Sequence, residues 1–465
     1  MARIYPFQAL RYDTSKVRME DVVTQPYDKI TPAMQQAYYD RSKYNLIRVI
    51  LGKKEPGDTD AFTPDATSTP QHNVYTRAAE SLVSWRKKGI LREETEPALY
   101  GYSQTYTVPN TDEVRERRGF IALGHLHDYA DQVVYRHEQT FPKHKSDRLA
   151  LFKATRAYCE QIYMLYSDPA FTAEQMIFDG GKPADLQITD EYNVVHRVWR
   201  LTDPHLINLI VTAMQDKKLI IADGHHRYET SVAYMHERAA ELGHTVSRHT
   251  DENDESPSNR ADEPHPHTLV PAFPEAAMMM TFVNMDAPGI TILPTHRVVF
   301  GLDTYSTEAF LAKAQQFFDI TTLVEPNLEE LTVSEGVAFI AATADGNHLL
   351  TAKPDAIRQA LAASHPGISP RQAQLDVVQL HNIVLEHLLG LSHESIARVE
   401  NIRYLRDAKE AVQQVHSGEA NVAFLIKPVT LQQLKDISLS NDVMPQKSTD
   451  FYPKLLSGLA IYALD

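Results

Sequence analysis

A short apolar run at residues 219–222 ends in Asp223-Gly224 and is followed by His-His-Arg at residues 225–227. The apolar run has the length of a strand, Asp-Gly is typical of a turn, and the residues after it predict a helix through Ala240. A helix N-terminus offers free backbone N–H groups and a partial positive charge. The arrangement therefore favours the binding of a phosphate group at the turn.

Each residue type in this turn suits a phosphate ligand. Gly224 lets the backbone approach a ligand closely, and Arg227 offers a fork of donors to phosphate oxygens. His225 and His226 can donate or accept hydrogen bonds or carry charge, and Asp223 is placed to hold magnesium or to orient a histidine. Two alternatives stay open. One is an ordinary strand-to-helix turn with surface histidines; the other is metal ligation by the histidines, which their adjacent spacing disfavours.

A second candidate is Glu138, which lies among cations in Arg136-His137-Glu138-Gln139-Thr140. Nearby positive charge would keep this glutamate ionised, so it could act as a general base for a hydroxyl nucleophile. The alternative is one partner in a surface ion network, which is the commoner outcome in charge-rich loops.

A third candidate is the polar stretch Lys447-Ser448-Thr449 near the C-terminus. These three side chains together can bind a carboxylate or a phosphate. The prolines Pro445 and Pro453 would stiffen the loop and reduce the cost of ordering it on binding. The alternative is an ordinary polar turn before the last strand.

The segment ADGHHRYETSVAY, residues 222–234, resembles the phosphate-binding turn of the ParB and sulfiredoxin superfamily. Together with residues 137–139 upstream and residues 447–449 downstream, it resembles the free-serine kinases of that superfamily. The stretch at residues 417–426 resembles the strand that leads to the last of these turns. The whole chain is similar to the large, mostly uncharacterised bacterial family DUF-1015, which shares these motifs.

The resemblance implies a kinase that transfers a phosphoryl group from ADP or ATP to the hydroxyl of free L-serine, or of a similar small hydroxylated substrate. The product with serine would be O-phospho-L-serine. It implies that Glu138 is the catalytic base and that His226 and Arg227 act on the transferred phosphoryl group.

The resemblance also implies the binding residues. Residues 223–227 would bind the nucleotide, with Asp223 as the ligand of Mg2+. His137, Lys447, Ser448 and Thr449 would hold the serine or its new phosphate. Because these segments are far apart in the sequence, we expect the C-terminal third to fold back toward Arg227, with the site in a cleft between domains.

Two other functions remain as alternatives. The first is a nucleotide-binding, ParB-like switch or regulatory protein without phosphotransfer. The second is a thiol-redox or nuclease activity like that of other members of the superfamily. Cys159, the one cysteine, lies in an apolar stretch, which favours a buried structural role over a reactive thiol.

Composition narrows the class of protein. The chain has 465 residues, 43% hydrophobic, and a formal net charge of −15, which argues against a nucleic-acid or anionic-membrane partner. One cysteine allows no internal disulfide bond, and no apolar run approaches the roughly 20 residues that span a bilayer. We expect a cytoplasmic protein whose oligomeric state the sequence leaves open.

The elements around these candidates alternate between strand and helix, so we predict a mixed α/β (α+β) fold with a ParB/sulfiredoxin-like nucleotide-binding core. The regions expected are an N-terminal α/β region at 1–95, the core at 96–270 with a mobile acidic loop at 246–268, and a C-terminal α/β domain at 271–465 that completes the substrate site. Strands are expected at residues 45–51, 99–108, 119–126, 195–201, 219–222, 276–283, 291–300, 337–342, 349–352 and 422–426, and helices at 73–87, 203–215, 228–240, 307–318, 377–389 and 407–415.

Overall fold

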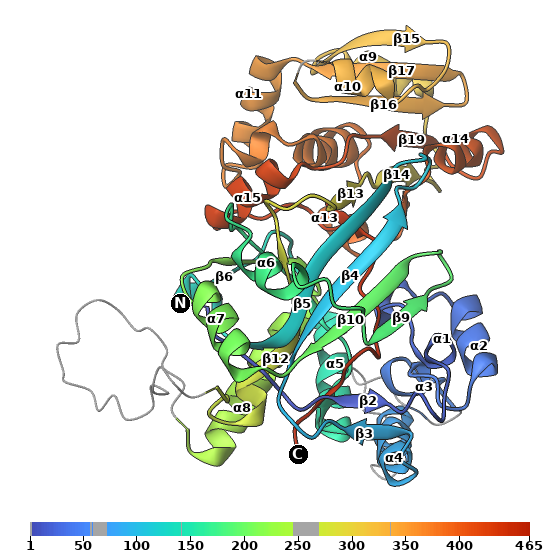
Figure 1. Cartoon of the computed structure of the whole chain (residues 1–465). Coiled ribbons are helices and arrows are strands. Elements are labelled where there is room, and N and C mark those ends of the chain that lie inside the picture. The colour runs from blue at the N-terminus through green and yellow to red at the C-terminus, as the bar shows by residue number, and fades with distance from the viewer. Residues whose placement is uncertain (1, 56–57, 59–71, 141, 245–268, 335) are drawn as a thin grey trace. The chain divides into compact units, whose positions relative to one another are not determined.

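The computed structural model describes residues 2–55, 58, 72–140, 142–244, 269–334 and 336–465. They form the mixed α/β fold that the sequence predicts (Figure 1). The chain divides into two compact units. Unit 1 comprises Met1–Tyr135, Thr140–Ile290 and Pro453–Asp465, and unit 2 comprises Arg136–Gln139 and Thr291–Tyr452.

These boundaries differ from those of the three regions expected from the sequence. Residues 1–95 and nearly all of 96–270 lie in one unit, and unit 2 takes most of region 271–465. The functions assigned to the three regions stay predictions. The expected mobile loop at 246–268 lies outside the described residues.

A nine-stranded mixed sheet forms the centre of unit 1. The strands, in spatial order, are β6 (Val134–Tyr135), β11 (Leu219–Asp223), β8 (Ile162–Tyr166), β12 (Ala277–Asn284), β5 (Val114–His125), β4 (Leu99–Thr107), β10 (Val195–Leu201) and β9 (Leu186–Thr189), with β1 (Ile4–Tyr5) paired to β5. Every residue of β8 and β12 is buried, and all except Thr281 and Asn284 are apolar, as expected where both faces of a sheet are covered.

Helices of unit 1 pack on this sheet and around its edges. α8 (His225–Leu242) contacts β8, β12 and α5. The helices of this unit are α1 (Met19–Val22), α2 (Pro32–Arg41), α3 (Ile47–Ile50), α4 (Val74–Lys87), α5 (Pro142–Thr155), α6 (Thr172–Phe178), α7 (Pro204–Met214) and α8. Two small sheets complete the unit and pair β2 (Leu10–Tyr12) with β3 (Leu91–Glu93), and β7 (Ala157–Tyr158) with β21 (Tyr462–Ala463).

Unit 2 is built on a six-stranded antiparallel sheet. Its strands, in spatial order, are β15 (Phe318–Leu323), β17 (Gly346–Ala352), β16 (Ala338–Thr343), β19 (Val422–Leu425), β14 (His296–Val299) and β18 (Ile402–Leu405). Apolar side chains of β16 and β19 pack against α14 (Ala408–His416) and form a hydrophobic core of unit 2. The other helices are α9 (Thr307–Ala314), α10 (Glu329–Val333), α11 (Pro354–Ser364), α12 (Asp376–Gln379), α13 (His393–Ala397), α15 (Leu431–Leu439) and a π-helix at Leu380–Leu388.

Three expected elements differ in the structure. The helix expected at 307–318 ends at Ala314, and Phe318 begins β15. The predicted strand at 45–51 is wrong, because this segment forms the single turn α3, started by an Asn45 side chain that accepts a hydrogen bond from Ile47 N–H at 2.9 Å. A short apolar run does not separate a strand from a buried helix. The predicted strand at 291–300 is two strands, β13 (Thr291–Leu293) and β14. Pro294, which cannot donate to a ladder, lies between them.

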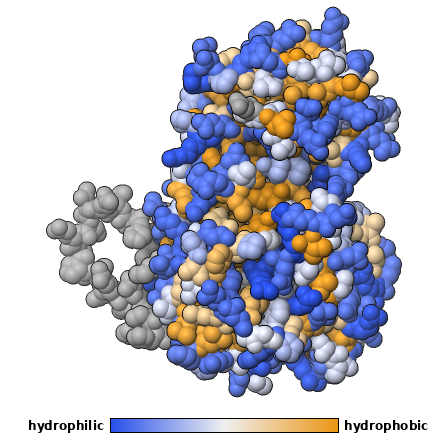
Figure 2. Space-filling model, turned by 45° about the horizontal axis from the view of Figure 1, so that its top comes forward, coloured by the Kyte–Doolittle hydropathy of each residue, from blue (hydrophilic) through white to orange (hydrophobic). Residues whose placement is uncertain are grey.

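Hydrophilic residues dominate the surface on the face that Figure 2 shows, and hydrophobic residues appear between them in patches. The single cysteine, Cys159, is buried as predicted, and burial raises the pKa of its thiol. Within the described part of the chain, no helix has the length and apolar character needed to cross a membrane.

Candidate functional site

The predicted strand–turn–helix is confirmed in unit 1. β11 ends at Asp223 and α8 begins at His225, with Gly224 between them at φ +97°. A Cβ at Gly224 would lie 3.1 Å from Ile162 Cδ1 and 3.2 Å from Arg227 Nη2. The left-handed backbone and the close neighbours both favour glycine here, and no side chain at the N-cap position bonds to the first turn of α8.

Asp223 forms a charge pair with Lys454, a residue that the sequence analysis did not select. Asp223 Oδ2 accepts a hydrogen bond from Lys454 Nζ at 3.1 Å, and its Oδ1 accepts one from Gly224 N–H at 3.0 Å. Burial opposes ionisation of Asp223, but Lys454, Arg227 and Lys29 outweigh it and hold the pKa of that carboxyl well below its usual range. Asp223 is therefore ionised at neutral pH.

Arg227 is buried, and one nitrogen of its guanidinium contacts other residues of unit 1. Its Nη1 donates to the Gln161 carbonyl oxygen at 2.6 Å and lies 4.0 Å from Glu160 Oε1. Burial lowers the pKa of Arg227, but Glu160 and Asp223 outweigh this effect, so the net pKa is raised and the guanidinium stays charged. The Nη2 atom is the one that lies beside Gly224.

Behind Arg227 lies a buried carboxylate between two arginines. Glu160 Oε2 lies 3.5 Å from Arg148 Nη1, and Glu160 Oε1 accepts a hydrogen bond from Tyr27 N–H at 3.0 Å. Burial raises the pKa of Glu160, and Arg227 and Arg148 oppose that rise. Glu160, Arg148 and Lys454 were not among the site residues predicted from the sequence. For Glu160 and Lys454, the usable signal was a charged residue inside an otherwise apolar stretch.

The two histidines of the turn differ in exposure: His225 is buried and His226 is half-buried. Over the described residues, no three His, Cys, Asp or Glu side chains are grouped closely enough to hold a metal ion. The assignment of a metal ion to Asp223 stays a prediction.

Glu138 belongs to unit 2, where it binds the backbone of the Lys-Ser-Thr stretch. Its Oε1 accepts a hydrogen bond from Lys447 N–H at 2.8 Å. The neighbouring His137 is buried, its Nε2 is hydrogen-bonded to Thr449 Oγ1 at 2.8 Å, and its carbonyl oxygen accepts from Met444 N–H at 2.8 Å. The structure thus brings the second and third sequence candidates together, although they lie about 310 residues apart.

Arg297 supports the other side of Lys447. Its Nη2 donates to the Lys447 carbonyl oxygen at 3.2 Å, and its side chain is fully buried. Lys447 has φ +58°, which costs energy in a residue with a Cβ, and its hydrogen bonds to Glu138 and Arg297 hold this conformation. Burial lowers the pKa of Arg297 to about 10, so it remains charged. Ser448 Oγ donates to the Pro445 carbonyl oxygen at 2.5 Å, inside the turn.

The candidates therefore fall into two groups. Asp223, Arg227 and Lys454 lie in unit 1, whereas Glu138 and residues 447–449 lie in unit 2. One continuous segment carries members of both groups, since four residues separate Thr449 from Lys454 in the sequence. The roles of these residues, and their convergence in one site, stay predictions.

The fold and the first group define a mixed α/β protein with a strand–turn–helix that carries charged side chains. The chain belongs to the family described as "Protein of unknown function (DUF1015)", whose model matches residues 4–378. This result confirms the resemblance to that family. No curated protein matches the chain.

The chain has a weak similarity to several solved structures, among them the following three. A conserved hypothetical protein from Pyrococcus furiosus is 11% identical, with 72% of this chain and 92% of that chain covered and a TM-score of 0.33. A free serine kinase in complex with AMP is 12% identical, with 72% and 86% covered and a TM-score of 0.33. SbnI with C-terminal truncation from Staphylococcus aureus is 10% identical, with 72% and 85% covered and a TM-score of 0.34. At these values the likeness carries no argument about function.

Proposed function

We propose that the chain is a kinase that transfers a phosphoryl group from ADP or ATP, with Mg2+, to the hydroxyl of free L-serine or a similar small hydroxylated acceptor. The observation that carries the proposal is the turn at Gly224, where the N-terminus of α8 lies beside the charged groups Asp223, Arg227 and Lys454. The order of the three motifs along the chain supports serine as the acceptor.

The donor nucleotide would bind at this turn through its phosphates. Gly224 leaves room for phosphate oxygens to approach the first N–H groups of α8, and Arg227 Nη2 and Lys454 supply positive charge. Asp223 is ionised and offers a carboxylate to Mg2+, which enters with the nucleotide. When bound, Mg2+ neutralises charge on the phosphates. Arg227 and His226 stabilise negative charge on the transferred group.

Glu138 would act on the acceptor. Its Oε1 is fixed by Lys447 N–H, so the orientation of the carboxylate is set before the substrate binds. In the reaction the acceptor oxygen forms a bond to the phosphorus and the bond from the phosphorus to the leaving nucleotide oxygen breaks. The hydroxyl proton passes to Glu138. The nucleotide leaves with one phosphate fewer.

The test uses the purified full chain with L-serine, Mg2+ and either ADP or ATP, and measures O-phospho-L-serine by mass spectrometry. We expect product with at least one donor. Nucleotide binding without transfer to any small hydroxyl compound would favour the alternative of a nucleotide-binding switch. Absence of both binding and product would reject the proposal.

The role of Glu138 is tested by Glu138→Gln, which keeps the shape of the side chain and its hydrogen bond to Lys447 N–H. Loss of a general base should lower turnover by roughly 100-fold or more, with nucleotide affinity nearly unchanged. Glu394→Gln is the control, because Glu394 is an exposed glutamate of unit 2 in a surface pair with Arg398. An equal loss of turnover and nucleotide affinity in Glu138→Gln would contradict the base role.

A further inference from the structure

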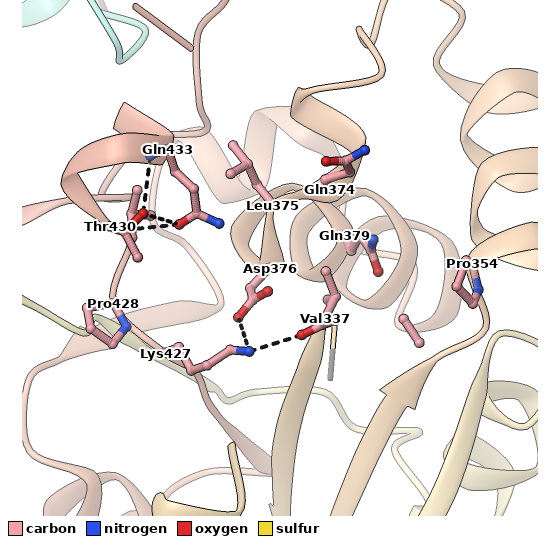
Figure 3. A pocket seen from close by; sticks show the side chains of 13 residues that line it. Val337, Pro354, Gln374, Leu375, Asp376, Gln379, Lys427, Pro428, Thr430 and Gln433 are labelled. Carbon is pink, nitrogen blue, oxygen red and sulfur yellow. Dashed lines mark hydrogen bonds and ion pairs between the residues drawn. The ribbon is translucent and has the colours of Figure 1, made fainter. Parts of the chain in front are cut away.

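Unit 2 contains a cavity of about 490 Å3 that involves none of the residues discussed above. It lies between the start of α12, the ends of β16 and β17, and the N-terminus of α15 (Figure 3). Pockets that bind small organic molecules have volumes of roughly 300–1,000 Å3. The cavity is therefore large enough for a small ligand.

One wall of the cavity carries a carboxylate and an amine. The Asp376 side chain is 14% exposed, and its Oδ2 lies 3.9 Å from Lys427 Nζ. Lys427 Nζ donates its hydrogen bond to the Gly336 carbonyl oxygen at 3.0 Å, and Figure 3 shows both contacts. At this separation the lysine only partly compensates the buried carboxylate, and burial raises the pKa of Asp376 to about 6. A buried, weakly compensated carboxylate in a cavity is a common feature of binding sites.

A second polar group lines the same cavity. Gln379 is 5% exposed, and its Nε2 donates to the Ala373 carbonyl oxygen at 2.8 Å. Its Oε1 is buried and has no hydrogen-bond partner within the described part of the chain. A buried acceptor without a partner is energetically unfavourable, so a ligand that brings a donor to Gln379 would remove that cost.

The rest of the wall is apolar on one side and polar on the other. Val337, Ala352 and Leu375 supply aliphatic surface. Opposite Asp376, Thr430 and Gln433 form a capping box at the start of α15, a helix of nine residues. The N-terminus of this helix adds partial positive charge near Lys427, which favours an anionic group on this side.

We propose that this cavity binds a small α-amino acid with an aliphatic side chain, as a ligand distinct from the kinase substrate. Its ammonium group would donate to Asp376 and to Gln379 Oε1. Its carboxylate would bind Lys427 beside the N-terminus of α15, and its side chain would pack on the aliphatic wall. A zwitterion satisfies the acid and the base of the cavity together, whereas a simple amine or a simple acid satisfies only one of them.

The experiment is isothermal titration calorimetry of the full chain, without nucleotide, against three matched probes. L-Leucine carries both charges, 3-methylbutylamine lacks the carboxylate, and 4-methylpentanoate lacks the ammonium group. We expect L-leucine to bind with one site per chain, and each truncated probe to bind at least tenfold more weakly, because each loses a charged hydrogen bond. Absence of L-leucine binding at millimolar concentration would overturn the proposal, as would equal binding of the amine alone.

Three variants test whether L-leucine binds in this cavity. Asp376→Asn and Lys427→Met should each weaken L-leucine binding by tenfold or more, whereas Asp319→Asn, an exposed carboxylate of unit 2, should leave it unchanged. Cooperative thermal unfolding of each variant checks that it is folded. L-Leucine binding that survives in folded Asp376→Asn would place the ligand elsewhere and contradict the proposal. Because no nucleotide or phosphotransfer is involved, this result is independent of the kinase test.

Discussion

Asp223, at the end of β11, forms an ion pair with Lys454 of the C-terminal segment, at a distance of 3.1 Å. Their side chains are 23% and 8% exposed, and Arg227 and Lys29 add positive charge around the carboxylate. Removal of one member of a buried pair leaves the other charge without compensation. The pair is therefore important for the stability of unit 1 as well as for the proposed binding of phosphate.

We predict that Asp223→Asn and Lys454→Met each lower the free energy of unfolding by about 3–5 kcal/mol at pH 7. The double variant should lose less than the sum of the two, because each single variant removes the same interaction. Urea unfolding measures these values. The control is Asp355→Asn, which removes an exposed pair with Arg358 and should cost no more than about 0.5 kcal/mol. Full additivity of the two changes would contradict a direct pair.

Because of this ion pair, the stability of unit 1 depends on pH. The pKa of Asp223 is lower in the folded state than its ordinary value of about 3.9. Its stabilising contribution is therefore fully present above about pH 4 and is lost as the pH falls below that value. The difference in stability between wild type and Asp223→Asn should shrink accordingly in acid.

At the scale of elements, Gly224 decides how β11 joins α8. Its left-handed backbone and its close neighbours Ile162 and Arg227 leave little room for a side chain. Gly243, at the other end of α8, also has a positive φ of 73°, but a Cβ there would meet no atom within 4 Å. Gly243 is therefore a control for Gly224. Both glycines have a left-handed backbone, but only a side chain at Gly224 would meet neighbouring atoms.

We predict that Gly224→Ala and Gly243→Ala each cost roughly 1–2 kcal/mol of stability, because alanine is strained in the left-handed region. Only Gly224→Ala should lower nucleotide affinity, by about tenfold or more, because its methyl group displaces Arg227 and blocks close approach of a phosphate. Urea unfolding and calorimetric titration with ADP and ATP measure the two effects. Equal nucleotide affinity in both variants would place the nucleotide away from this turn.

Most of the elements that the sequence predicts are present in the structure, and the misses have physical causes. The periodic apolar positions of α4 and α14 predict those helices within about two residues at each end. β13 was not separated from β14, although Pro294 between them was a local signal for the break. The pairing of β13 with β20 (Asp450–Tyr452), about 160 residues further along the chain, could not be predicted in this way. A local pattern contains no information about a partner at that distance.

At the scale of the molecule, unit 2 is a nearly continuous insertion. Thr291 pairs with Tyr452 in the two-stranded sheet of β13 and β20, so the two ends of segment 291–452 lie side by side. Segments with adjacent ends and a core of their own commonly fold as independent domains. Only residues 136–139 enter unit 2 from elsewhere in the chain.

We predict that residues 291–452 expressed alone fold cooperatively, with lower stability than in the full chain. The stability is lower because His137 and Glu138 no longer bind Met444, Lys447 and Thr449. Circular dichroism during urea unfolding would show one sigmoidal transition. Addition of a peptide that spans residues 136–139 should shift this transition to higher urea. A chain segment without any cooperative transition would contradict the independence of unit 2.

The sequence alone determined the strand, turn and helix around Gly224 and the separate candidates at Glu138 and Lys447, because each depends on residue types that are neighbours in the chain. The tertiary structure alone decided that Asp223 pairs with Lys454, 231 residues away, and that Glu138 binds Lys447, 309 residues away. It alone also revealed the cavity at Asp376. Such contacts depend on how strands register and pack across a sheet, and no pattern within a short window of the sequence specifies that arrangement.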